Sequence, residues 1–374
     1  MADTSNDPQY MLRALELARR GQGFVEPNPM VGAVIISGAE FLAEGWHQRL
    51  GGPHAEIEAV NIAGKAAAGA TLYVTLEPCS HHGKTPPCTE AIMAAGIKRV
   101  VAAMQDPFPK VSGSGFKRLT EAGLAVEVGL EEAAARELNA PYLKLLSTGK
   151  PWVIAKWAMT LDGKIATRSG ESKWISGEAS REIVQQLRSR VDAIVIGRRT
   201  AELDDPMLVA RCSTVQRVAT RIILDSQCRL SLKSQLVKTA REFPVLIAVG
   251  PGADENKIRE LASAGCEVVS LKETLPILRV RELLDELGRR RMTNVLVEGG
   301  SQLLGTMFDA GQIDEVHVFM APKLFGGQQA PSPIGGSGVE QVAQSLNLAS
   351  TSIRQVGSDI YIQGRIAHAQ PLRS

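Results

Sequence analysis

The feature that most constrains the fold of this chain is a repeated alternation between short apolar segments and longer amphipathic segments. Apolar runs of this length are typical of buried strands, and the amphipathic stretches between them are typical of helices. In the first part of the chain we expect strands at 30–38, 70–79, 98–107 and 124–130, and helices at 9–21, 54–64, 86–97 and 131–146. The alternation predicts an α/β fold, and Asp7-Pro8 predicts a helix start with Asp7 as N-cap.

The alternation is interrupted once and then starts again. Residues 147–151 have turn composition, so we place a domain boundary there. Beyond it we expect helices at 178–190 and 280–291, and strands at 152–159, 191–197, 220–225, 244–250, 266–271, 294–300, 315–322 and 359–366. Because 374 residues are enough for two separate cores, the sequence predicts two α/β domains, at 1–148 and 149–374.

Composition excludes several classes of function. The 42 basic and 40 acidic residues leave a net charge of +2, which gives no strong electrostatic attraction to nucleic acid. No apolar run approaches the roughly 20 residues of a membrane span, and the polar N-terminus has no signal-peptide pattern. The five cysteines are an odd number and fit a reducing compartment. We therefore expect a cytoplasmic protein with a small-molecule substrate, neither nucleic acid nor membrane as partner, and weakly favour a homo-oligomer.

One set of residues carries the chemistry expected of a zinc site. His54 and Glu56 begin an expected helix, and Cys79 and Cys88 flank the start of the next one. Histidine and thiolate are ligands that zinc prefers, and three protein ligands leave a fourth position for water. Bound zinc lowers the pKa of that water to about 7 and so supplies a nucleophile. We expect His54, Cys79 and Cys88 to bind zinc and Glu56 to act as general acid and base, the pattern of the zinc deaminases.

The spacing of the two cysteines leaves alternatives open. The general deaminase pattern has two residues between them, whereas eight separate Cys79 from Cys88 here. A structural zinc would need a fourth ligand, which His81 or His82 could supply. The chain could then be a zinc-stabilised binding module, or a deaminase of nucleic-acid bases, although 4% aromatic residues do not favour a base-stacking groove.

The second half has features suited to an anionic cofactor. It lacks the glycine-rich fingerprint of a Rossmann site. Gly299 and Gly300 lie between an expected strand and a helix, where backbone N–H groups can meet a pyrophosphate. Arg198 and Arg199 follow another expected strand and are candidates for the phosphate that distinguishes NADP from NAD.

These motifs together resemble one known family. The segments "PNPMVGAV", "HAE", "EPCSHHGKTPPC", "AKWAMTLDGKIAT" and "SKWISG" are similar to those of the bacterial bifunctional deaminase–reductases of riboflavin biosynthesis, and the resemblance covers nearly the whole chain. It implies a cytidine-deaminase-like domain followed by a dihydrofolate-reductase-like domain. It also implies zinc-dependent deamination of a diaminopyrimidinone that bears a ribosylamino 5′-phosphate, and then NADPH-dependent reduction of the ribosylamino group to ribitylamino.

The resemblance also implies functional residues. The deaminase substrate would contact Asn28, His47, His81 and Lys84. The cofactor NADPH would contact Ala158, Trp174, Thr200, Asp204, Ser226, Gly300, Ser301 and Gln302. The sugar-phosphate substrate of the reductase would contact Ser172, Arg188, Leu208, Arg211 and Glu298. The proton donor of the reduction is left open between Lys156, Asp204, Glu298 and water, and one of the two domains could be inactive in this chain.

Overall fold

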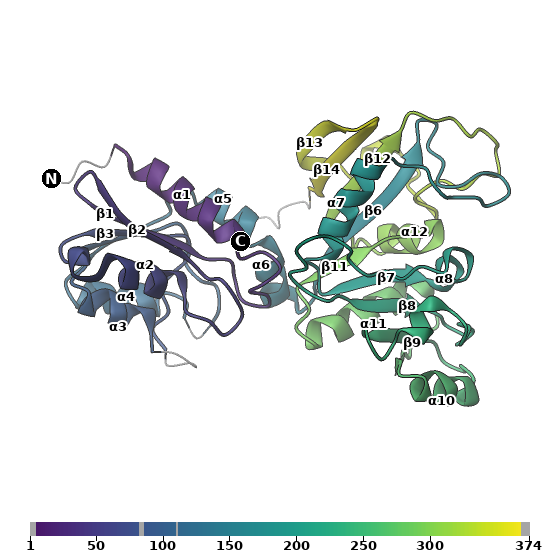
Figure 1. Cartoon of the computed structure of the whole chain (residues 1–374), viewed down its shortest axis with the longest axis horizontal. Helices are drawn as coiled ribbons and strands as arrows, with labels where there is room; N and C mark the ends of the chain where they lie inside the picture. Colours follow the sequence, from purple (N-terminus) through teal and green to yellow (C-terminus); the bar gives the residue numbers. More distant parts are fainter. Residues whose placement is uncertain (1–4, 82–85, 110, 368–374) are drawn as a thin grey trace. The chain divides into compact units, whose positions relative to one another are not determined.

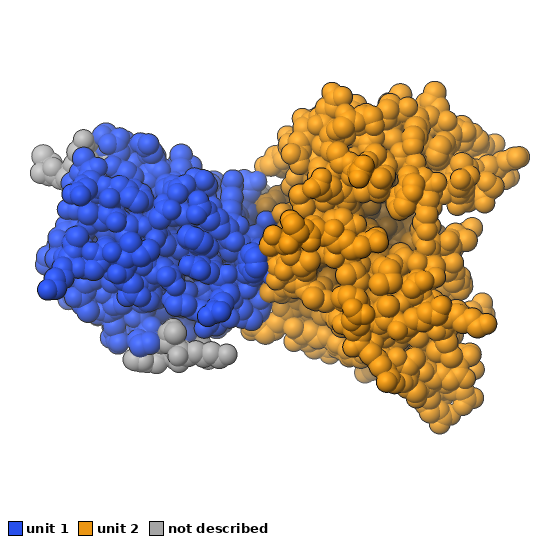
Figure 2. Space-filling view, in the orientation of Figure 1, with its two compact units in different colours: residues 1–148 blue, residues 149–374 orange. Residues whose placement is uncertain are grey.

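The structure is a computed structural model that describes residues 5–81, 86–109 and 111–367. The chain divides into two compact units, Met1–Thr148 and Gly149–Ser374, which we call unit 1 and unit 2 and which Figure 2 shows in different colours. Among the described residues, no helix is both long and apolar enough to cross a membrane.

Unit 1 is built on a mixed sheet of strand order β2-β1-β3-β4-β5 (Figure 1). Strand β1 is antiparallel to both β2 and β3, whereas β3, β4 and β5 run parallel. The strands described in unit 1 are β1 (Gly32–Ser37), β2 (Glu40–Trp46), β3 (Thr71–Val74), β4 (Arg99–Ala102) and β5 (Ala125–Val128). Its helices are α1 (Asp7–Arg19), α2 (Ala55–Ala63), α3 (Cys88–Ala94), α4 (Ser114–Glu121), α5 (Glu132–Leu138) and α6 (Ala140–Thr148), with the 3-10 turn η1 (Gly64–Ala67).

The helices of unit 1 pack on both faces of this sheet. Helices α1 and α5 contact each other on one face, and α2, α3 and α4 form the contacts of the other (Figure 1). Helix α2 lies so close to β2 that a Cβ on Gly45 would stand 2.6 Å from the carbonyl oxygen of Ala55. A glycine at this position therefore allows the backbone at the start of α2 to rest directly on the sheet.

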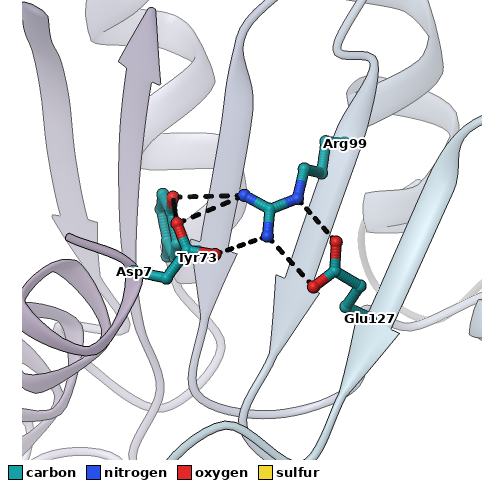
Figure 3. A network of polar contacts seen from close by, with 4 residues as sticks. All are labelled: Asp7, Tyr73, Arg99 and Glu127. Carbon is teal, nitrogen blue, oxygen red and sulfur yellow. Dashed lines mark hydrogen bonds and ion pairs between the residues drawn. The ribbon is translucent and has the colours of Figure 1, made fainter. Parts of the chain in front are cut away.

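A polar network ties the start of α1 to the strands beneath it (Figure 3). Tyr73 donates a 2.5 Å hydrogen bond to the Asp7 carboxylate, and Arg99 lies between this carboxylate and that of Glu127, at 2.5 and 2.8 Å. The expectation that Asp7 is an N-cap is wrong, because the helix begins at Asp7 itself with Asn6 in the cap position. Asp7 instead meets an arginine of β4 and a tyrosine of β3.

Arg99→Met should lower the free energy of unfolding of unit 1 by about 3 kcal/mol, because it removes the guanidinium from a largely buried carboxylate. The side chain of Asp7 is only 9% exposed and that of Arg99 11%. The matched control is Arg136→Met, which breaks an exposed pair with Glu132 one helical turn away and should cost under about 0.5 kcal/mol. Urea unfolding of the two variants measures the difference, and equal losses would contradict the role of the network.

Unit 2 is built on a sheet of strand order β10-β9-β8-β7-β11-β6-β12-β14-β13. All neighbours from β10 to β12 run parallel, and β14 and β13 are antiparallel additions at one edge. The parallel strands are β6 (Trp152–Thr160), β7 (Ala193–Gly197), β8 (Thr220–Leu224), β9 (Val245–Val249), β10 (Glu267–Ser270), β11 (Asn294–Val297) and β12 (Glu315–Ala321). The edge strands are β13 (Leu348–Val356) and β14 (Asp359–Ile366).

The helices of unit 2 follow most of these strands. They are α7 (Glu178–Arg188), α8 (Arg198–Asp204), α9 (Gln235–Lys238), α10 (Glu255–Ser263), α11 (Pro276–Arg289) and α12 (Ser301–Asp309), with the 3-10 turn η2 (Val342–Gln344). The apolar side chains of β6, β7 and β11 form a core with α11 and α12. Each expected strand of this half is present, and the structure adds β13, which was not expected.

Candidate active sites

The three expected zinc ligands meet in unit 1. His54 directly precedes α2, Cys79 follows β3, and Cys88 is the first residue of α3. His54 Nδ1 lies 3.2 Å from Cys88 Sγ and 3.6 Å from Cys79 Sγ, and the three ligand atoms all lie within 4.8 Å of one another. The sheet thus brings together residues that are up to 34 positions apart in sequence.

This geometry fits a tetrahedral zinc ion. Zinc–sulfur and zinc–nitrogen bonds at a tetrahedral angle would separate the nitrogen and sulfur ligands by about 3.6 Å. Among the described residues the cluster has three members and no fourth. His81 is exposed and not part of it, and His82 lies outside the described residues. The described residues thus supply three ligands, the number that catalytic zinc sites take from the protein.

The polar contacts of the cluster favour negative charge on the sulfur of Cys79. The backbone N–H of Cys88 donates to Cys79 Sγ at 3.3 Å. The pKa of Cys79 falls to about 4, because Cys88 and His54 both hydrogen-bond to its sulfur and stabilise the thiolate. The pKa of Cys88 is raised by the same contact with Cys79 and by burial. A thiolate held in this way is the form of cysteine that binds a metal.

Glu56 lies beside the cluster but outside it. It is in the first turn of α2, and only 3% of it is exposed. Burial raises the pKa of Glu56, and the charge of the neighbouring His54 opposes that shift. The carboxyl group is thus close to the ligands without being one of them.

The residues expected at the deaminase substrate are partly gathered here. The ring of His47 lies edge-on to that of His54, with centroids 5.4 Å apart, and its Nε2 is 3.4 Å from Asn28 Nδ2. His47 Nδ1 is 2.8 Å from the carbonyl oxygen of Pro53, so it carries the proton, and burial lowers the pKa of this histidine. Nε2 is then free to accept from the Asn28 amide. Lys84 lies outside the described residues.

Two acidic residues near the cluster were not predicted from the sequence. Glu77, two residues before Cys79, accepts hydrogen bonds from the backbone N–H groups of Gly113 and Gly115 at 2.9 and 2.8 Å. Glu77 therefore holds the loop after β4 against the segment that leads to Cys79. Asp106 in that loop has a pKa raised by burial, and the charges of His81 and Cys79 both act on it. The sequence feature that could have identified Asp106 is its position after β4, because the carboxyl ends of adjacent parallel strands lie together on one side of a sheet.

In unit 2 the expected cofactor and substrate residues gather at the carboxyl ends of four neighbouring strands. Strands β8, β7, β11 and β6 are adjacent and parallel. Most of the expected residues lie at or beyond the carboxyl ends of these four strands, where open α/β sheets bind their ligands. They are Ala158, Ser172, Trp174, Thr200, Asp204, Leu208, Arg211, Ser226, Glu298, Gly300, Ser301 and Gln302.

The strongest direct contact in this region is a buried ion-pair triad. Arg188, at the end of α7, binds Glu298 through both carboxylate oxygens, at 2.5 and 2.8 Å. Lys156 Nζ on β6 lies 3.7 Å from the same carboxylate, and the side chain of Glu298 is 5% exposed. Burial alone would raise the pKa of Glu298, but the charges of Arg188 and Lys156 outweigh it and lower the pKa. The pKa of Lys156 is lowered, chiefly by burial.

Two further pairs of expected residues meet. Ser172 Oγ donates to Asp204 Oδ1 at 3.1 Å. A Cβ on Gly300 would stand 3.2 Å from Thr200 Oγ1, so the turn after β11 approaches α8 closely. Trp174 is 65% exposed and stacks against the Arg181 guanidinium at 4.7 Å.

The remaining expected residues form no side-chain hydrogen bond or ion pair with one another in the described part of the chain. Leu208 is buried, and Arg211 is exposed and donates its backbone N–H to Gln185. Of the two arginines expected at a phosphate, Arg198 is paired with Glu202 at 2.5 Å. Arg199 is exposed.

Comparisons with known proteins match both units. Residues 4–104 match the cytidine and deoxycytidylate deaminase zinc-binding region, and residues 151–362 match the RibD C-terminal domain. The riboflavin biosynthesis protein RibD of Actinobacillus pleuropneumoniae is 43% identical over 359 residues, which cover 96% of this chain and 95% of that protein.

Solved structures agree with these matches. The structure of Acinetobacter baumannii RibD, form 1, superposes with a TM-score of 0.86 at 37% identity, covering 98% of this chain and 100% of that one. A diaminohydroxyphosphoribosylaminopyrimidine deaminase/5-amino-6-(5-phosphoribosylamino)uracil reductase from Thermotoga maritima superposes with a TM-score of 0.84 at 34% identity, covering 96% and 98%.

The fold class expected from the sequence is confirmed, with a cytidine-deaminase-like domain first and a RibD-type reductase domain second. The resemblance to the riboflavin enzymes is confirmed as well. The chain therefore belongs to the RibD family of riboflavin biosynthesis proteins, bifunctional enzymes that join a zinc-binding deaminase to an NADPH-dependent reductase.

Proposed function

We propose that unit 1 deaminates a diaminopyrimidinone bearing a ribosylamino 5′-phosphate, and that unit 2 then reduces the ribosylamino group of the product to ribitylamino with NADPH. The support is that the two family matches, 4–104 and 151–362, each fall within one unit. The substrate is proposed from the relative of Thermotoga maritima, whose name describes a deaminase and a reductase of such phosphoribosylamino compounds.

The observation that carries the deaminase assignment is the convergence of His54, Cys79 and Cys88 beside a buried Glu56. Zinc, when bound by these three residues, lowers the pKa of the attacking water and polarises the reacting centre. Glu56 would accept one proton from the attacking water and pass it to the ring nitrogen, and would then take the second proton from the added hydroxyl group and pass it to the leaving amine. Asn28, His47, His81 and Lys84 bind the substrate, and the Asn28–His47 contact keeps these two side chains in fixed orientation.

In unit 2, Arg188 and Arg211 bind the substrate phosphate, since guanidinium groups bind phosphate through paired hydrogen bonds. Both oxygens of Glu298 are engaged with Arg188 and Lys156. We assign to Glu298 the role of holding these two cations at the substrate, and to Ser172 and Leu208 the role of further substrate contacts. The lowered pKa of Glu298 makes it a poor proton donor, whereas Lys156 at the same site carries donatable protons.

NADPH binds at the carboxyl ends of the adjacent strands β8, β7, β11 and β6. The helix N-terminus of α12, at Gly300, Ser301 and Gln302, suits the pyrophosphate because its backbone N–H groups are not used within the helix. The other proposed cofactor contacts are Ala158, Trp174, Thr200, Asp204 and Ser226, which extend across the same four strands. NADPH supplies the hydride for C1′ of the sugar, and the protein positions the two partners.

Cys88→Ser tests the deaminase site. We expect it to reduce bound zinc from one ion per chain to nearly none and to abolish ammonia release, because a hydroxyl is a much weaker zinc ligand than a thiolate. Reduction of the deaminated substrate by the same variant should stay near that of the unchanged protein. Metal analysis and the two assays measure this, and Cys212→Ser, a cysteine of unit 2, is the control. Full zinc content in the Cys88 variant would contradict the ligand set.

We also propose that the protein is a homo-oligomer. The edge hairpin β13–β14 presents apolar side chains to solvent, among them Ile353 at 67% and Ile360 at 42% exposure. A second copy covering this edge would remove that surface from water. Sedimentation of the full chain tests the idea, and a mass of 40.1 kDa at all concentrations would contradict it. The cytoplasmic location and the absence of nucleic acid as a partner stay predictions.

A further inference from the structure

Two loops leave the sheet of unit 2 side by side. Strands β6 and β12 are parallel neighbours in register up to Thr160 and Ala321. The loop after β6 carries Ser172 and Trp174, and the loop after β12 runs from residue 322 to the start of β13. Leu161 N–H donates to the carbonyl of Lys323 at 2.9 Å, so the loops are joined where they leave the sheet.

Further along, the same two loops are joined by one backbone hydrogen bond and by two lysine side chains. Lys164 Nζ donates to the carbonyl oxygen of Ala330 at 3.2 Å, and Ile165 N–H donates to that of Pro331 at 3.0 Å. Lys323 Nζ donates to the carbonyl oxygen of Trp174 at 2.7 Å. The segment 322–338, which we call the brace, therefore holds the backbone at a residue proposed to contact NADPH.

Asp162 anchors the first end of the brace. Its carboxylate accepts the N–H groups of Phe325 and Gly326 at 3.2 and 2.7 Å, and the Thr160 hydroxyl at 2.6 Å. These donors lower the pKa of Asp162 to about 2, so it is ionised at neutral pH. One side chain thus connects the end of β6 to the turn at residues 325 and 326.

Asp309 anchors the other end, on α12. Its carboxylate accepts the N–H groups of Ser337 and Gly338 at 2.8 and 3.2 Å. Gly335 N–H donates to the carbonyl oxygen of Ser301 at 3.0 Å. A Cβ on Gly305 would stand 2.2 Å from the carbonyl carbon of Gly335, so this end of the brace lies directly on the helix.

We propose that the brace fixes the spacing between the two sides of the cofactor site, with Asp162 and Asp309 as positioning residues for NADPH. One side is the loop with Ser172 and Trp174, and the other is the N-terminal turn of α12 with Ser301. This inference rests on the proposed cofactor residues. Neither aspartate need touch NADPH, because each acts through the backbone that it anchors.

Loss of either anchor of the brace should weaken the binding of NADPH. When one anchor is lost, the loop that carries Trp174 must be ordered by NADPH itself, and part of the binding energy is then spent on ordering. Asp162→Asn keeps the shape of the side chain. It replaces one of the two acceptor oxygens with an NH₂ group, which cannot accept a hydrogen bond from the N–H groups of the brace. We expect the dissociation constant of NADPH to rise about tenfold, the effect of one or two lost charge-assisted hydrogen bonds.

The experiment titrates NADPH into the intact full-length protein by calorimetry, for Asp162→Asn, Asp309→Asn and the double variant. Each single variant should weaken binding about tenfold, and the double variant should weaken it by much less than the product, because the second anchor cannot fix a brace that is already loose. The matched control is Asp254→Asn, an exposed aspartate of unit 2 that accepts a backbone N–H of α10 at 2.8 Å and should change nothing. Ammonia release by unit 1 checks that each variant is correctly quantified, and the urea unfolding transition of unit 2 checks that the altered unit is folded.

NADPH affinity within twofold of the unchanged protein in both single variants would overturn the proposal, and so would strictly multiplicative effects in the double variant. Thr200→Val, measured in parallel, separates this failure from a failure of the cofactor site. If Thr200→Val weakens NADPH and the aspartate variants do not, the site stands and the brace has only a structural role. If none of them weakens NADPH, the assignment of the cofactor residues fails with it.

Discussion

Glu56→Gln should lower the rate of ammonia release by a factor of about 100 to 10,000, the range that a positioned general acid and base contributes. Glutamine has the size of glutamate but cannot accept and return a proton. Because Glu56 lies outside the ligand cluster, the variant should keep one zinc per chain. Reduction by unit 2 should be unchanged, since that reaction uses other residues.

The matched control for this variant is Glu58→Gln, which changes a partly exposed carboxylate in the same turn of α2. It should deaminate at a rate close to that of the unchanged protein. Ammonia release from the Glu56 variant within tenfold of the control would rule out the proton-transfer role. Loss of zinc from it would instead place Glu56 among the groups that hold the metal.

Glu298→Gln should lower the rate of reduction by at least about a hundredfold, because removing one partner of a buried ion pair costs about 3 to 5 kcal/mol. Arg188 and Lys156 would then be two buried cations without their shared carboxylate. They would repel each other and move away from the geometry that binds the sugar phosphate. Oxidation of NADPH in the presence of the deaminated substrate measures the loss, and the rate of ammonia release by the same protein is an internal standard.

Glu286→Gln is the control, because Glu286 forms a partly exposed ion pair with Arg290 at the end of α11 and has no part in the triad. Its effect on reduction should be small, as ion pairs accessible to solvent contribute little. A Glu298 variant that reduces its substrate as fast as this control would show that the triad is not part of the site. A variant that has lost the unfolding transition of unit 2 would be replaced by Arg188→Lys, which keeps the charge but loses the bidentate contact.

The convergence of His54, Cys79 and Cys88 is the part of the proposed sites that the sequence predicted best. His54 stands just before a helix, and Cys79 follows a strand, so local patterns place each ligand at the same edge of a sheet. The eight residues between Cys79 and Cys88 did not prevent this, because only the two ends of that segment need to approach His54. Local sequence patterns identified the three ligands, and the pairing of strands in the sheet brings them together.

Elements whose side chains face solvent were missed. Strand β13 is exposed almost along its whole length, so it lacks the apolar run by which a buried strand is identified. Strand β2 carries glutamate at two positions and is exposed at its start, and it was not expected either. The Asp7 N-cap was wrong for a related reason, since Arg99 is 92 residues away and no local pattern shows that it binds this carboxylate.

Contacts between distant residues in unit 2 were equally invisible in the sequence. Arg188 and Glu298 are 110 residues apart, and both were expected near the substrate, but not in contact with each other. Asp162 and the turn it anchors at Gly326 are 164 residues apart. These contacts depend on the order of strands in the sheet, in which β11 and β12 flank β6 although they follow it by more than 130 residues.

The most direct test of the account is to give the purified chain the diaminopyrimidinone ribosyl phosphate, with and without NADPH, and to follow ammonia and NADPH together. Ammonia should be released at the same initial rate in both cases, and NADPH should be oxidised only after a lag that follows deamination. The lag should disappear when deaminated substrate is supplied. Oxidation of NADPH without prior ammonia release, or no ammonia release at all, would contradict the assignment of the two units.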